Sequence, residues 1–345
     1  MNKVRVGVVG VGYWGPNIIR NVAQSALFEL AVLCDRNAQS MEKIKKLYPQ
    51  VSCVADAKLI FADPSIDAVI IVTDILSHEK LGLAALAAGK HVFIEKPLAA
   101  TGSACQRLMA SAKKHKRILM VGHTFLYNNA VHALKQLMKK PEFGETLYLH
   151  CQRLNLGRVQ FNTGTLWSMA PHDVSIVNYL LDARPTKVSA SGFSFLTNEI
   201  EDIAFMNLVY PNNKIVHIHV SWLYPEKIRK ISVVGSKQMI VYDDVSAEAK
   251  LVIYDKSMVK PVGSGQVTPY KDFSEFQYDL RVGDVHIPRV DFKEPLRVEM
   301  KHFAECIQKN QTPVSDGQNG YEVVKVLETA EKSLRLGGKE LTIKW

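Results

Sequence analysis

The sequence lacks the features of a membrane, secreted or zinc-binding protein. Only five of its 345 residues are cysteines, and they are scattered without the paired spacing of a disulfide framework or a zinc site. No apolar run approaches the roughly 20 residues that span a bilayer, and glycines interrupt the first apolar run where a signal peptide would end in a cleavage site. We therefore expect a cytoplasmic protein with reduced thiols, no membrane association and no bound metal.

Long blocks of like charge are also missing. The formal net charge is +9, from 43 Lys and Arg against 34 Asp and Glu, but the basic residues are spread along the chain. A nucleic-acid partner is therefore not expected. The excess charge favours a solvated basic surface, and attraction of an anionic substrate is the alternative.

What is present is a two-part pattern of elements. The length and the 47% hydrophobic content are typical of a soluble protein with two domains. The first part alternates strands and helices, which predicts an α/β domain with a doubly wound parallel sheet. The expected strands are 4–9, 28–34, 51–54, 68–72, 91–94 and 118–122, and the expected helices are 17–23, 40–48, 78–88 and 99–115.

The second part has long strands with alternating polarity and few helices, which predicts a large, open, mostly antiparallel sheet. In the strand expected at 214–222, for example, His217 and His219 share the more polar face. Helices are expected near 131–138, 300–307 and 323–334, and a last short strand at 341–343. We predict a dinucleotide-binding domain over 1–122 and a substrate-binding and oligomerisation domain over 123–345.

A glycine-rich turn follows the first strand. Gly10, Gly12 and Gly15 have the spacing of a dinucleotide-binding motif, in which they permit the turn, the approach of a pyrophosphate and close helix packing. Asp35 ends the second strand, where a carboxylate binds the adenine ribose and favours NAD over NADP, although the neighbouring Arg36 weakens that preference.

Ligands of open parallel sheets bind beyond the carboxyl ends of the strands, where Thr73, Glu95 and His123 are expected. Lys96 follows Glu95 and precedes Pro97, and its ammonium can stabilise an alkoxide or, when desolvated, act as a base. The predicted cofactor-binding residues are Gly10, Gly12, Tyr13, Trp14, Gly15, Asp35, Arg36, Thr73, His78, Glu95, Lys96 and Pro97.

Several segments resemble the Gfo/Idh/MocA family of NAD(P)-dependent dehydrogenases and reductases of sugars, cyclitols and nucleotide sugars. They are GVGYWG at 10–15, TDILSH at 73–78, AAGKHVFIEKPLA at 87–99, WSMAPHD at 167–173, GDVHIPRVDFKEPL at 283–296 and SDGQNGYEVVKVLETAEKSL at 315–334. The resemblance implies that Lys96 and His172 form the catalytic pair.

The sequence departs from the family pattern at three positions. Ser168 stands where the family commonly has an aspartate four residues before the histidine, Asp74 replaces a proline or asparagine, and Tyr127 stands in the region of a familiar arginine. The segments 12–17, 153–157 and 167–173 look most like a branch that contains UDP-N-acetylglucosamine 3-dehydrogenases, and Arg153 and Arg158 could pair with the diphosphate of such a substrate.

The resemblance implies an NAD-dependent oxidoreductase that transfers a hydride between a secondary hydroxyl of a sugar, C3 of a UDP-N-acetylhexosamine or a similar nucleotide sugar, and nicotinamide. The alternatives are a dehydrogenase or reductase of a free sugar or a cyclitol such as inositol, and a non-catalytic NAD(H)-sensing protein. The expected substrate-binding residues are Lys96, His123, Tyr127, Arg153, Asn155, Arg158, Trp167, Ser168 and His172. We also expect a homodimer or homotetramer that associates through the sheet of the second domain.

Overall fold

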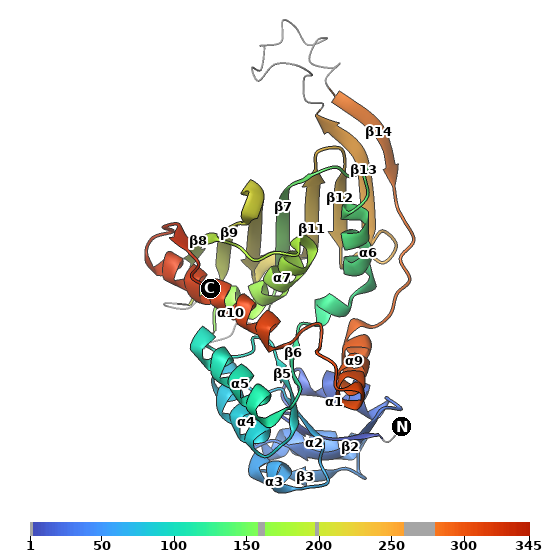
Figure 1. The fold of residues 1–345 in the computed structure, drawn as a ribbon, viewed down its shortest axis with the longest axis vertical. Helices are drawn as coiled ribbons and strands as arrows, with labels where there is room; N and C mark the ends of the chain where they lie inside the picture. The colour runs from blue at the N-terminus through green and yellow to red at the C-terminus, as the bar shows by residue number, and fades with distance from the viewer. Residues whose placement is uncertain (1–2, 158–162, 197–199, 259–279) are drawn as a thin grey trace, which may run out of the picture. The chain divides into compact units, whose positions relative to one another are not determined.

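A computed structural model describes residues 3–157, 163–196, 200–258 and 280–345 (Figure 1). The chain divides into two compact units, one of residues 1–127 and 293–328 and the other of residues 128–292 and 329–345. This division differs from the expected boundary at residue 122, because the chain returns to the first unit near its end. Among the described residues, no helix is long and apolar enough to cross a membrane.

The first unit is built on a six-stranded sheet whose strands are all parallel, in the order β3-β2-β1-β4-β5-β6. This is the predicted doubly wound arrangement. The strand order proceeds outward in opposite directions from β1 and β4, which are neighbours at the centre of the sheet. The strands are β1 (Val4–Val9), β2 (Phe28–Cys34), β3 (Ser52–Val54), β4 (Ala68–Ile71), β5 (His91–Glu95) and β6 (Leu119–Gly122).

Helices on the two faces bury these strands, which accounts for their nearly continuous apolar sequence. The helices of this unit are α1 (Gly15–Ala23), α2 (Ala38–Leu47), α3 (Ala57–Ala62), α4 (Ile75–Ala87), α5 (Gly102–His115), the 3-10 turn η1 (Thr124–Tyr127), α9 (Pro295–Lys309) and the first part of α10 (Gly317–Arg335). Phe303 of α9 is fully buried and packs on Phe28 and Phe93. The late helix α9 therefore contributes to the core of the first unit.

The second unit is built on a nine-stranded sheet in the order β14-β13-β12-β11-β7-β10-β9-β8-β15. Only β10 and β7 pair in parallel, so the predicted mostly antiparallel sheet is confirmed. Its strands are β7 (Thr146–Leu156), β8 (Lys187–Phe193), β9 (Ile203–Val209), β10 (Ile215–Ser221), β11 (Leu223–Gly235), β12 (Met239–Asp243), β13 (Leu251–Met258), β14 (Leu280–His286) and β15 (Leu341–Thr342).

Helices α6 (Asn129–Met138) and α7 (Thr165–Leu181) lie on one face of this sheet (Figure 1). The side chains of β10 show the reason, since Val216, Ile218 and Val220 are buried while His217 and His219 on the opposite face are half-buried. The alternation of polarity therefore assigns one face of the sheet to the core. A second 3-10 turn, η2 (Pro211–Asn213), joins β9 to β10.

Candidate functional site

The glycine-rich loop joins β1 to α1 in the first unit. Gly10 has a φ of 102°, and a Cβ there would lie 2.5 Å from the carbonyl oxygen of Val72. A Cβ at Gly15 would lie 2.5 Å from the carbonyl oxygen of Gly10. The turn and the close entry into α1 therefore both require glycine.

Gly12 is different because a Cβ there would meet no described atom within 4 Å. It is exposed at the amino-terminal end of α1, where unpaired backbone N–H groups and the helix dipole favour an anion. The absence of a side chain leaves room for a ligand to approach the backbone. The loop therefore fits the pyrophosphate of a dinucleotide.

Asp35 lies directly after β2, and its carboxylate faces this loop. Oδ2 accepts a hydrogen bond from the backbone N–H of Val11 at 2.8 Å, and Oδ1 accepts one from the N–H of Asn37 at 2.8 Å. The adjacent Arg36 is exposed, as is Tyr13 in the loop. A carboxylate held beside the glycine turn is the arrangement that recognises an unphosphorylated adenine ribose.

Glu95 ends β5 and is buried, with 8% of its surface exposed. Its Oε1 accepts a hydrogen bond from the indole nitrogen of Trp14 at 2.9 Å, and its Oε2 accepts one from the backbone N–H of Lys96 at 3.1 Å. Burial raises the pKa of Glu95 to about 7, although the charge of Lys96 and these hydrogen bonds oppose the shift. Gly122 lies opposite Glu95 in register, and a Cβ there would lie 2.9 Å from Oε2.

His78 connects two of the predicted cofactor-binding segments. Its buried ring places Nδ1 2.9 Å from the carbonyl oxygen of Pro97 and Nε2 3.1 Å from that of Thr73. Burial lowers the pKa of His78. The hydroxyl of Ser77 donates a further hydrogen bond, 2.6 Å long, to Oγ1 of Thr73. Lys96 is partly exposed. The backbone on either side of it is fixed by the hydrogen bonds of Glu95 and His78.

Two residues expected to bind substrate have partners inside the first unit. His123 is fully buried, its Nδ1 lies 2.6 Å from Oδ1 of Asn319, and burial lowers its pKa to about 4. The buried hydroxyl of Tyr127 lies 3.0 Å from Oγ of Ser315. The returning segment 293–328 thus contacts the hydroxyl of Tyr127, and the expected contact of Tyr127 with a substrate stays a prediction.

Glu299, which was not among the predicted site residues, is a carboxylate close to this cluster. It is fully buried on α9, its Oε2 accepts a hydrogen bond from Thr124 at 2.7 Å, and its Oε1 has no partner among the described residues. Burial, assisted by the charge of Glu95, raises the pKa of Glu299 well above its ordinary value. An acid three residues after Leu296 and four before Phe303, on the apolar face of the helix, was a signal in the sequence.

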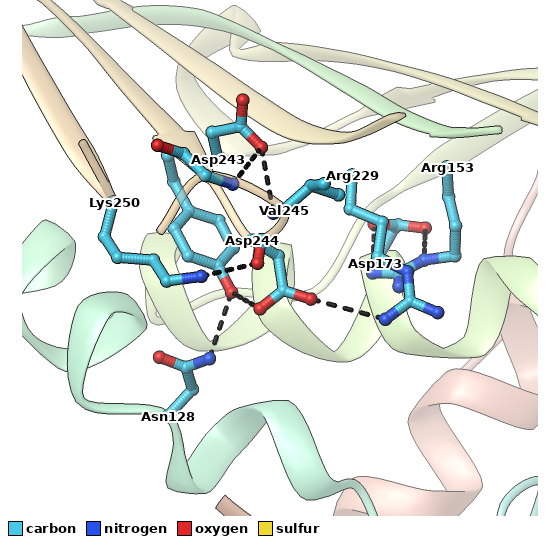
Figure 2. A network of polar contacts seen from close by, with 10 residues as sticks. Asn128, Arg153, Asp173, Arg229, Asp243, Asp244, Val245 and Lys250 are labelled. Atoms are coloured by element: carbon cyan, nitrogen blue, oxygen red, sulfur yellow. Dashed lines mark hydrogen bonds and ion pairs between the residues drawn. The ribbon is translucent and has the colours of Figure 1, made fainter. Parts of the chain in front are cut away.

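In the second unit, Arg153 of β7 forms a buried ion pair with Asp173 of α7 (Figure 2). The guanidinium, which was expected to pair with a diphosphate, bonds instead to a carboxylate of the chain itself, and the diphosphate contact stays a prediction. No local pattern in the sequence shows that α7 supplies a carboxylate to Arg153. The other predicted partner, Arg158, lies outside the described residues.

Helix α7 carries the predicted residues Trp167, Ser168 and His172, all of them partly exposed on a largely buried helix. Ser168 and His172 are four residues apart, so they lie on one face. The indole nitrogen of Trp167 donates a hydrogen bond to Glu331 at 3.2 Å. The predicted Asn155 is partly exposed near the end of β7. Lys96 belongs to the first unit and His172 to the second.

Both parts of the chain match domain models of one protein family. Residues 4–123 match the oxidoreductase family with an NAD-binding Rossmann fold, GFO/IDH/MocA, and residues 131–241 match a C-terminal domain of the same family. The chain belongs to the GFO/IDH/MocA family. The family resemblance seen in the sequence motifs is therefore confirmed, as is the α/β fold.

Similar proteins include dehydrogenases of two kinds of substrate. An inositol 2-dehydrogenase of Pseudomonas fluorescens is 31% identical over 185 residues, which are 52% of this chain and 55% of that protein. The chain thus spans about half the length of this relative. Among solved structures, UDP-N-acetylglucosamine 3-dehydrogenase GnnA from Acidithiobacillus ferrooxidans has a TM-score of 0.81 at 22% identity, over 97% of this chain and 99% of that one. GenD2 from gentamicin A biosynthesis, in complex with NAD, has a TM-score of 0.83 at 17% identity, over 100% of this chain and 97% of that one.

Proposed function

We propose that the protein is an NAD-dependent dehydrogenase that oxidises a secondary hydroxyl of a sugar or cyclitol. The main observation is the environment of Lys96, which follows a buried carboxylate and lies on a segment bound by His78 and Trp14. Family membership and the open space at Gly12 support NAD as the cofactor. The Asp35 carboxylate favours NAD over NADP, because it would repel a 2′-phosphate.

In this proposal Lys96 and His172 divide the handling of the hydroxyl proton. His172 accepts the proton, and the Lys96 ammonium stabilises the negative charge that develops on oxygen. A bound NAD supplies the hydride acceptor. The fixed backbone around Lys96 reduces the reorganisation needed when this charge forms.

For the substrate we propose a nucleotide sugar, a UDP-N-acetylhexosamine oxidised at C3. The motifs at 12–17 and 167–173 and the net positive charge support this class. A cyclitol such as inositol is the second candidate, which the inositol 2-dehydrogenases among the relatives favour. Arg153, one of the two arginines expected to bind a diphosphate, already pairs with Asp173, and this also favours the cyclitol.

The test is turnover by the full chain with NAD or NADP and a panel of UDP-N-acetylglucosamine, myo-inositol and free hexoses, followed by NADH absorbance and product mass. Lys96→Ala and His172→Ala should each lower kcat at least 100-fold at saturating NAD, while both variants still fold and bind NAD. Wild-type turnover in both variants would overturn the assignment. Binding of NAD without oxidation of any compound in the panel would instead favour the NAD(H)-sensing alternative.

We further propose that the protein acts as a homodimer or homotetramer in the cytoplasm. The open face of the second-unit sheet carries exposed apolar side chains, among them Tyr148 and Ile215, and a second copy of the chain would cover them as a homodimer or homotetramer. The five cysteines are free thiols, which supports a reducing cytoplasm as the place of action.

A further inference from the structure

Arg153 and Asp173 lie between β7 and α7 and are shielded from water. Their side chains are 6% and 1% exposed. The Nε of Arg153 donates to Oδ2 of Asp173 at 2.8 Å, and a terminal nitrogen donates to Oδ1 at 2.9 Å (Figure 2). Two parallel hydrogen bonds fix the plane of the carboxylate as well as its distance.

The pair occupies a place that the strand pattern assigns to an apolar residue. Leu149 and Cys151 precede Arg153 on the same face of β7, and both are fully buried. A buried ion pair adds little net stability compared with well-packed apolar side chains. Its presence is therefore better explained by the orientation that it imposes than by stability.

A second arginine lies beside the first on the neighbouring strand of the sheet. Arg229 of β11 is the register partner of Arg153, and two cations in this relationship repel each other. Arg229 pairs with Asp244 at 3.3 Å, and the charge of Asp244 also raises the pKa of Arg153. Loss of Asp173 would remove both of its hydrogen bonds with Arg153, which lies beside a second cation.

The carboxylate of Asp244 extends the contacts to another helix. Its Oδ1 accepts a hydrogen bond from the hydroxyl of Tyr242 at 2.8 Å, and that hydroxyl accepts one from Asn128 at 3.0 Å (Figure 2). Asn128 also caps α6 by accepting a hydrogen bond from the N–H of Ala130. The polar groups around Arg153 thus connect α7, β7, β11, β12 and the start of α6.

His172 directly precedes Asp173 in α7, and Pro171 precedes His172. Proline has no N–H, so the carbonyl of Trp167 loses its intrahelical donor, and the helix is weakened at the turn that carries the histidine. Consecutive helical residues point about 100° apart. An anchor on Asp173 therefore sets the direction in which the neighbouring His172 leaves the helix.

We propose that Arg153 and Asp173 are positioning residues for His172. They hold the rotation of α7 at this turn, so that the imidazole keeps one orientation on the partly exposed face of the helix. The catalytic meaning of this orientation rests on the function proposed above.

The first test does not require a substrate. A two-dimensional ¹H–¹⁵N spectrum of the histidine rings at fixed pH, assigned with His172→Gln, reports the environment of His172 in the full chain. In Asp173→Asn its ring resonances should shift and broaden. The matched control is Asp182→Asn, which removes the ion pair with Lys135 at the other end of α7 and suits the left-handed backbone there. Unchanged His172 resonances in Asp173→Asn, or equal changes in both variants, would overturn the proposal.

The second test separates positioning from stability. The double variant Arg153→Met/Asp173→Leu replaces the pair by apolar side chains and should recover the melting temperature that Asp173→Asn loses. Its kcat for oxidation of the sugar substrate should stay at least 10-fold below that of wild type, and its KM for NAD should stay within twofold of the wild-type value. A wild-type kcat and His172 spectrum in the double variant would refute the positioning role. Full turnover by His172→Ala would refute the proposed catalytic role of His172 instead, and the spectra would still decide the orientation of the ring.

Discussion

The indole nitrogen of Trp14 donates a hydrogen bond to the carboxylate of Glu95, across 81 residues of sequence. Trp14 lies in the glycine-rich loop, and Glu95 precedes Lys96. The bond therefore joins the proposed phosphate-binding turn to the proposed catalytic lysine within the first unit. Burial raises the pKa of Glu95 to about 7, so the partner of this indole changes charge near neutral pH.

Trp14 should report that change in charge directly. We expect the fluorescence of the protein to show a transition near pH 7, because the carboxylate next to the indole gains a negative charge there. Glu95→Gln should abolish the transition. Trp345→Phe should retain it, because the indole of Trp345 is bonded to the carbonyl of Pro185, which does not titrate. A transition that persists in Glu95→Gln would show that another group is responsible.

The same carboxyl should make stability depend on pH. Its folded-state pKa is raised from 4.5 to about 7, so the folded protein binds the proton more tightly, and the resulting stability is present at low pH and lost as pH rises through 7. The unfolding free energy of Glu95→Gln minus that of wild type should therefore increase by up to about 3 kcal/mol from pH 5 to pH 8. Urea denaturation at the two pH values measures the difference. An equal difference at both values would contradict the assignment.

The glycines of the loop provide a matched pair of variants. Gly10→Ala forces a side chain onto a backbone with a φ of 102° and against the carbonyl of Val72, so it should lower the unfolding free energy by about 2 kcal/mol or more. Gly12→Ala meets no described atom and should leave the melting temperature within about 2 °C. It should nevertheless weaken NAD binding at least 10-fold in calorimetric titration. Unchanged binding by Gly12→Ala would argue against a pyrophosphate at this turn.

The sequence predicted most of the first unit, because buried parallel strands and glycine turns leave strong local patterns. It missed α3 (Ala57–Ala62), since a six-residue helix is too short to show a period. It also missed the return of α9 to the first unit, because no local pattern states which core an amphipathic helix joins. The partners of Tyr127 and Arg153 were missed for the same reason: Ser315 and Asp173 are distant in sequence, and no local pattern indicates these contacts.

Cofactor choice should depend on Asp35. Asp35→Ser removes the negative charge beside the loop, so the ratio of NADP to NAD affinity should rise at least 10-fold, about 1.4 kcal/mol. The exposed Arg36 should supply part of that gain, and Asp35→Ser/Arg36→Ala should lose it. Dissociation constants for both cofactors, measured with each variant, give the ratio. A ratio that stays at the wild-type value in Asp35→Ser would place the adenine ribose elsewhere.

Self-association should depend on the open face of the second-unit sheet. Tyr148 and Ile215 are register partners on β7 and β10, and they are 50% and 51% exposed, so they form a contiguous apolar surface beside Phe205 and His217, whose rings stack. Tyr148→Lys/Ile215→Lys places two charges in the proposed interface between copies. Each unpaired charge should raise the dissociation constant of the assembly about 10-fold or more. Sedimentation velocity should therefore show smaller species than wild type. Leu59→Lys, which changes a 60% exposed leucine of the first unit, should sediment as wild type. An assembly that survives the double lysine variant would use another surface.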